Sequence, residues 1–161
     1  MTISVGDKIP ESSLSIMTEI GPSPLSTESL FSGKKVVLFS GPGAFTPTCS
    51  ARHLPGFVDH ADEILSRGVD TIACMAVNDV FVMDAWGKSA AADSIQMVAD
   101  GNGDFSRALG LEIDARAFGM GHRGARFALV ADDGVVTHLF IEAPGEYKVS
   151  SAEHVLTQLE A

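Results

Sequence analysis

The sequence is short of basic residues and of long apolar runs. Its 161 residues hold 11 Lys and Arg against 21 Asp and Glu, which gives a formal net charge of -10 at pH 7. A chain this acidic repels nucleic acid and anionic lipid, so neither is an expected partner. No apolar run approaches the roughly 20 residues that span a bilayer, and we expect no membrane partner either.

Cysteine is also scarce, because only Cys49 and Cys74 occur. Residues 1–7 carry neither a basic region nor an apolar stretch of signal-peptide length, so we expect a cytoplasmic protein with both thiols reduced. His60, His122, His138 and His154 have no paired spacing with cysteines or carboxylates. The sequence therefore predicts no metal site, and nothing in it calls for a cofactor.

The composition, 45% hydrophobic and 20% charged, is that of one globular domain over residues 1–161. Apolar runs predict strands at 34–40, 69–77 and 95–99, a hairpin of strands 126–131 and 135–141, and an edge hairpin before residue 25. Helices are expected at 47–67, 80–88, 105–109 and after a capping box of Ser150 and Glu153, and residues 111–124 are expected to form a loop. Pro55 predicts a kink at 51–54 in the first of these helices. This alternation is typical of an α/β layered sheet.

The stretch 41–50 turns on two glycines between an apolar strand and a helix. Thr46 is a favourable N-cap and Pro47 suits the first helical position, which puts Cys49 in the first turn. Unpaired N–H groups and the helix dipole favour a thiolate there, so Cys49 is expected to be a nucleophile. The alternative is a small core residue, but the neighbouring Thr, Ser and Pro side chains make buried packing an unexpected role.

The segment PGAFTPTCSARHLPGF at 42–57 closely resembles the active-site segment of the type II peroxiredoxins, the peroxiredoxin 5 subfamily. Residues 76–83 and 126–130 are similar to further segments of that family, and 149–152 to its plant-like branch. The resemblance implies a thioredoxin-like fold with an N-terminal hairpin extension and a central mixed sheet flanked by helices. It also implies a thiol-dependent peroxidase that reduces hydrogen peroxide and small organic hydroperoxides.

Cleaving a peroxide by thiolate attack requires a held nucleophile and hydrogen-bond donors for the departing oxygen. Cys49 supplies the nucleophile, and the Thr46 hydroxyl is expected to face both sulfur and peroxide. Pro47 is expected to limit water access, and the N–H groups of Thr48 and Cys49 are further donors. The missing positive charge is assigned to Arg126, which lies in a segment similar to the family's arginine strand, in preference to Arg123.

His53 and Cys74 each leave two interpretations open. His53 follows Cys49 by four residues and either tunes the site or supports it through a hydrogen bond. Cys74, in an apolar strand, is either a core residue or the thiol that resolves a Cys49 sulfenic acid. Animal members of the subfamily carry a resolving cysteine near Ser150, so the resemblance favours an external thiol, either glutathione with glutaredoxin or thioredoxin.

The resemblance further implies a homodimer whose contact includes Phe45, Phe81, Met83 and Trp86, although these residues are also compatible with a core role. Two other functions would use the same cysteine. A disulfide reductase is disfavoured because position 52 is arginine rather than the second cysteine of a Cys-x-x-Cys pair. A redox sensor or holdase, in which Cys49 oxidation switches partner binding, is compatible with the sequence.

Overall fold

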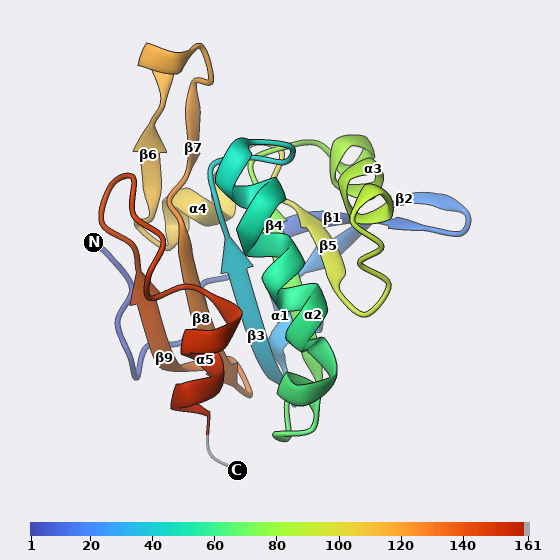
Figure 1. Cartoon of the computed structure of the whole chain (residues 1–161), viewed down its shortest axis with the longest axis vertical. Helices are drawn as coiled ribbons and strands as arrows, with labels where there is room; N and C mark the ends of the chain where they lie inside the picture. Colours follow the sequence, from blue (N-terminus) through green and yellow to red (C-terminus); the bar gives the residue numbers. More distant parts are fainter. Residues whose placement is uncertain (160–161) are drawn as a thin grey trace.

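The structure, a computed structural model, describes residues 1–159 as a seven-stranded mixed sheet with helices on both faces (Figure 1). In spatial order the strands are β2 (Gly21–Ser26), β1 (Ser13–Thr18), β5 (Gln96–Ala99), β4 (Thr71–Ala76), β3 (Lys35–Ser40), β8 (Phe127–Asp132) and β9 (Val135–Ile141). The helices are α1 (Thr27–Phe31), α2 (Leu54–Leu65), α3 (Val80–Ser89), α4 (Asp104–Ala108) and α5 (Ala152–Gln158). Strand β3, which leads into the 41–50 stretch, pairs in parallel with β4 and antiparallel with β8.

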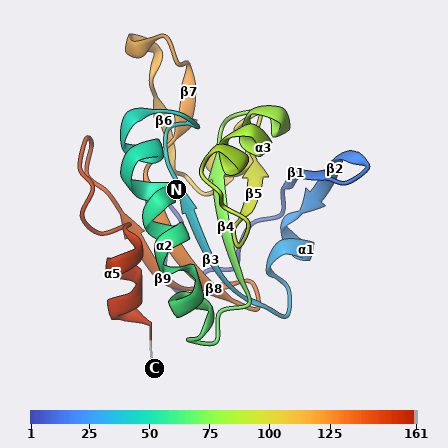
Figure 2. The same cartoon turned by 45° about the vertical axis from the view of Figure 1, so that its right-hand side comes forward.

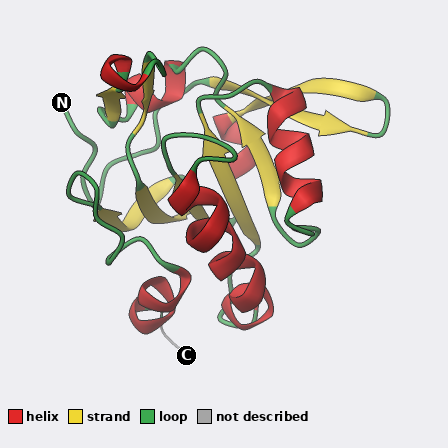
Figure 3. Cartoon of the chain, turned by 45° about the horizontal axis from the view of Figure 1, so that its top comes forward, coloured by secondary structure: helices red, strands yellow, loops and turns green. Residues whose placement is uncertain are grey.

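The continuous apolar run of β3 is explained by burial on both faces of the sheet. Val37 and Phe39 belong to a cluster that packs under α2, α3 and α5, whereas Val36 and Leu38 belong to a second cluster with α1 and α4. Figure 2 shows α2, α3 and α5 in front of the sheet, and Figure 3 shows the β1–β2 hairpin projecting at one edge of it. Within the described residues, no helix is long and apolar enough to cross a membrane.

The predicted 47–67 helix begins at Pro47 but is not regular. Residues Cys49–His53 form a π-helical turn in which the Leu54 N–H donates to the Cys49 carbonyl, and α2 ends at Leu65. Pro55 has no N–H to donate to the carbonyl four residues earlier, so the turn widens at the place where a kink was predicted.

Two expectations were wrong. Residues 111–124 form a second small sheet of β6 (Glu112–Asp114) and β7 (His122–Gly124), joined by a 3-10 turn at Arg116–Phe118. The N-cap of α5 is Ser151, whose side chain accepts from the His154 N–H, and not Ser150. The Ser150 hydroxyl does not cap the helix because it donates to the Glu142 carboxylate.

Candidate active site

Cys49 lies where the β3-to-helix loop meets the start of β8. It is buried, with 1% of its surface exposed, which contradicts the expectation that a cysteine in this polar stretch would not be packed. The backbone of Gly41 passes directly over the sulfur, since a Cβ atom placed there would lie 2.5 Å from Cys49 Sγ and 3.1 Å from Arg126 Nη1. Only a glycine fits this close approach.

Arg126 is the residue just before β8, and its side chain contacts Cys49. Its Nη2 donates to Cys49 Sγ at 3.2 Å, and its Nη1 donates to His53 Nδ1 at 2.9 Å. Arg123, the competing arginine, donates instead to the carbonyls of Pro42 and Met120. The arginine beside the sulfur is therefore the one that the sequence favoured, and Arg123 ties the β7 strand to the loop before Cys49.

His53 is buried between Arg126 and the chain segment after β9. Its Nε2 lies 2.9 Å from the Ser150 carbonyl, which only accepts, so the ring proton is on Nε2 and Nδ1 accepts from Arg126. Burial, followed by the nearby Arg126 charge, lowers the pKa of His53 to about 3. His53 is thus neutral near pH 7 and has the geometry of a hydrogen-bonded support.

The residues before Cys49 only partly follow the sequence interpretation. The Thr46 hydroxyl donates to the Gly43 carbonyl at 2.7 Å, so it does not act as the predicted side-chain N-cap. Pro47 occupies the first helical position and is exposed to solvent. Thr48 is half-buried and borders a groove beside Arg126.

That groove has a volume of about 530 Å³. One wall comes from the β6 region and the other from the segment after β9; the lining residues are Pro42, Thr48, Ile113, Asp114, Phe118, Ala125, Arg126, Glu142, Ala143, Pro144, Gly145 and Glu146. Figure 1 shows both segments rising on the side of the sheet formed by β8 and β9. Sequence reasoning missed both walls, because residues 111–124 were expected to be a loop and the turn after β9 carries no recognisable motif.

Comparison with known proteins places this geometry in a family. A sequence model of the Redoxin family matches residues 4–156. Peroxiredoxin-2B of Arabidopsis thaliana is 48% identical over 159 residues, which cover 98% of this chain and 98% of that protein. Chloroplastic peroxiredoxin-2E of the same plant is 49% identical over 166 residues, covering 98% and 70%. The chain belongs to the peroxiredoxins.

A solved structure has the same fold as this peroxiredoxin over almost the whole chain. Reduced Prx3 from Vibrio vulnificus in complex with H2O2 superimposes with a TM-score of 0.96 at 50% identity, covering 99% of this chain and 100% of that one. The resemblance to type II peroxiredoxins and the expected thioredoxin-like α/β fold are both confirmed. This peroxiredoxin is a thiol-dependent peroxidase.

Cys74 of this peroxiredoxin lies inside β4, between Phe39 and Met97 on the neighbouring strands. It is fully buried in the apolar cluster that also holds Cys49, and both cysteines are free. Burial, with a smaller contribution from Cys49, raises the pKa of Cys74 well above its ordinary value. A thiol held neutral in the core favours the packing interpretation of Cys74.

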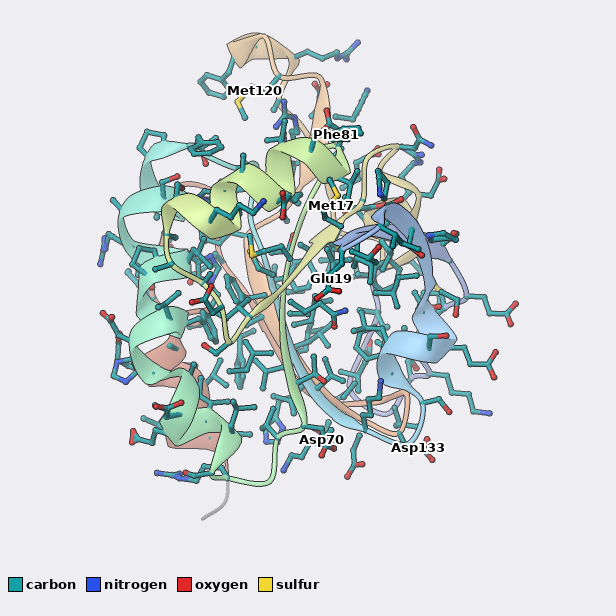
Figure 4. The ribbon with its side chains drawn as sticks, turned by 90° about the vertical axis from the view of Figure 1, so that its right-hand side faces the viewer. Met17, Glu19, Asp70, Phe81, Met120 and Asp133 are labelled. Atoms are coloured by element: carbon teal, nitrogen blue, oxygen red, sulfur yellow. The ribbon has the colours of Figure 1, made fainter. Side chains whose placement is uncertain are left out.

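The four residues assigned to a dimer contact separate into two pairs. Phe45 and Phe81 are 55% and 63% exposed, and Figure 4 shows Phe81 on the outside of the fold at the start of α3. Met83 and Trp86 are 0% and 3% exposed, so their assignment to a surface contact was wrong. Both sit on the inner side of α3, where Trp86 Nε1 donates to Ser50 Oγ at 3.1 Å.

Proposed function

We propose that Cys49 is the peroxidatic nucleophile of this peroxiredoxin and that Arg126 is its charged partner. The observation that carries the proposal is the 3.2 Å contact between Arg126 Nη2 and Cys49 Sγ inside a buried site. A guanidinium in that position stabilises the thiolate and then the negative charge that develops on the leaving oxygen of the peroxide. Low local polarity strengthens both interactions.

In the reaction, the Cys49 thiolate attacks one oxygen of a hydroperoxide, so an S–O bond forms as the O–O bond breaks. The sulfur is oxidised by two electrons to a sulfenic acid, and the departing oxygen takes a proton to leave as water or an alcohol. The Thr46 hydroxyl, whose proton is directed to Gly43, keeps its lone pairs to accept from the peroxide O–H. The N–H groups of Thr48 and Cys49 are assigned as further donors, and Pro47 as the rigid residue that limits water access to the sulfur.

Hydrogen peroxide and small organic hydroperoxides are the proposed substrates. The groove beside Arg126 supports the second class, because Ile113, Phe118 and Pro144 give it apolar walls. An alkyl group lying there would leave its peroxide end at Arg126. The groove is far larger than hydrogen peroxide requires.

The sulfenic acid is proposed to be returned by an external thiol, glutathione with glutaredoxin or else thioredoxin. The first thiol forms a disulfide with Cys49 and releases water, and a second thiol then displaces the Cys49 thiolate. The burial of Cys74 in β4 and the serine at position 150 support an external over an internal donor.

The protein is further proposed to form a homodimer through Phe45 and Phe81, supported by the exposure of both rings. Phe45 also has a positive φ of 62°, an uncommon conformation for a non-glycine residue that holds its ring outward on the loop before Cys49. The cytosol remains the proposed compartment, to be tested by fractionation of the source cells.

One experiment tests the chemistry directly. Reduced protein is mixed with one equivalent of hydrogen peroxide, with and without glutathione, and Cys49 is examined by mass spectrometry. We expect a sulfenic acid on Cys49 without glutathione and a mixed disulfide between Cys49 and glutathione when glutathione is present. The Cys49→Ser variant should consume no peroxide. A Cys49 that stays unmodified while peroxide persists would overturn the proposed function, and a Cys49–Cys74 disulfide would replace the external thiol by an internal one.

A further inference from the structure

Glu142, the residue directly after β9, gathers an unusual number of hydrogen bonds. Its Oε2 accepts from the backbone N–H groups of Lys148 at 2.8 Å, Val149 at 2.9 Å and Ser150 at 2.8 Å. The Ser150 hydroxyl donates to the same oxygen at 2.7 Å. Partial burial opposes the charge, but the hydrogen bonds from Ser150, Lys148 and Val149 outweigh it and hold the pKa of Glu142 below its ordinary value.

These bonds fold residues 142–150 back onto the active site. The Glu142 N–H donates to the Arg126 carbonyl at 3.0 Å, which fixes one end of the segment beside the catalytic arginine. At the other end, the buried Ser150 presents its carbonyl to His53 Nε2 at 2.9 Å. Between them, the Tyr147 ring packs edge-on against His53 with 5.3 Å between ring centroids.

His53 passes this constraint on to Arg126. With its Nε2–H held by Ser150, the ring presents the Nδ1 lone pair to Arg126 Nη1 at 2.9 Å. That bond fixes the plane of the guanidinium, and the second nitrogen, Nη2, then faces Cys49 Sγ. A rotated imidazole would present an N–H to the arginine and release it.

We propose that Glu142 is a positioning residue for peroxide reduction: by fixing the 142–150 segment it holds the Ser150 carbonyl on His53, and His53 in turn directs Arg126 at Cys49. The inference rests on the proposed roles of Cys49 and Arg126 and adds a residue that does not contact the reacting atoms. It also gives Ser150 a role, through both its carbonyl and its hydroxyl.

The test is a double-mutant cycle on the second-order rate constant of the reduced protein with hydrogen peroxide, measured by competition with a peroxidase of known rate. Glu142→Gln keeps the size of the side chain but replaces the carboxylate, which accepts four hydrogen bonds, with a neutral amide. We expect a loss of roughly tenfold or more, as for a displacement of catalytic groups by a fraction of an ångström. Glu153→Gln is the matched control, because Glu153 is an exposed carboxylate on α5 paired with His60, and it should keep the wild-type rate.

In the Arg126→Ala background, Glu142→Gln should cause no further loss, because the residue through which it acts is gone. An unchanged rate in Glu142→Gln, an equal loss in the Arg126→Ala background, or the same loss in Glu153→Gln would each overturn the inference. A wild-type protein that fails to consume peroxide would instead overturn the proposed function itself.

If Glu142→Gln does not fold, Ser150→Ala carries the same cycle. It removes one of the four hydrogen bonds and leaves the carboxylate and the His53 contact in place. A loss of roughly twofold to tenfold is expected, in line with one hydrogen bond, and it should vanish in the Arg126→Ala background. A wild-type rate for Ser150→Ala, or a loss that persists without Arg126, would then count against the inference.

Discussion

Replacing Gly41 by alanine is the sharpest single perturbation of this site. The added Cβ would lie 2.5 Å from Cys49 Sγ and 3.1 Å from Arg126 Nη1. Because non-bonded heavy atoms are ordinarily about 3.5–4.0 Å apart, the sulfur or the loop must move by about 1 Å. The guanidinium, fixed by His53, cannot follow the sulfur without losing that bond.

A displacement of about 1 Å between catalytic groups costs on the order of a hundredfold in rate. We therefore expect Gly41→Ala to lower kcat/KM for hydrogen peroxide by about that factor, whereas overpacking of this kind destabilises the fold by only about 1–3 kcal/mol. Peroxide consumption in the presence of excess reductant measures the first quantity, and urea unfolding measures the second.

Gly101→Ala is the matched control. A Cβ at Gly101 would make an ordinary contact of 3.7 Å with the Asn78 carbonyl, so neither rate nor stability should change appreciably. A folded Gly41→Ala protein that reduces peroxide at the wild-type rate would refute the reasoning, because the sulfur would then tolerate a displacement that this geometry forbids.

Three other predictions concern His53, Cys74 and Phe81. His53 is protonated below about pH 6.5 in the unfolded chain, but only near its pKa of about 3 in the folded protein. The contribution of His53 to the free energy of unfolding is therefore full above pH 6.5 and is lost as the pH falls toward 3. In urea unfolding, the free energy of unfolding of the wild-type protein should fall by about 2 kcal/mol between pH 7 and pH 5, and the His53→Gln variant should not show this fall. Cys74→Ser should keep turnover with glutathione and glutaredoxin while losing about 1–3 kcal/mol of stability to the buried hydroxyl; a collapse of turnover in a folded variant would make Cys74 the resolving thiol. Phe81→Asp should shift a dimer to monomer in sedimentation at micromolar concentration, and a wild-type protein that is already monomeric there would contradict the dimer.

Local patterns predicted much of the scaffold around Cys49. The start of α3 is predictable because a capping bond spans only three residues: Asn78 and Asp79 both suit an N-cap, and in the structure Asp79 accepts from the Val82 N–H. The hairpin at Asp133-Gly134 was predictable for the same reason, and its φ angles of 48° and 78° are those that Asp-Gly supplies. The position of Cys49 in the first helical turn likewise depends only on its neighbours.

The features that sequence reasoning missed depend on partners distant in the chain. Ser150 fits a capping box locally, but the Glu142 carboxylate competes for it and moves the cap to Ser151. Met83 and Trp86 were assigned to a dimer contact from the family resemblance, with a core role left open, and only the sheet beneath α3 decides which side of the helix is buried. The burial of Cys49 follows from Gly41 and Arg126, which a local reading of the 41–50 stretch does not place over the sulfur.

Because Trp86 donates a hydrogen bond to Ser50, its intrinsic fluorescence is expected to report on the turn that holds Cys49. Trp86 is the single tryptophan of the chain, and its indole N–H is held by the residue that directly follows Cys49. Any unwinding of the π-helical turn that exposes the oxidised sulfur to a reducing thiol must release that indole. Stopped-flow measurement of Trp86 fluorescence should therefore give the rate at which the turn opens, without an added label.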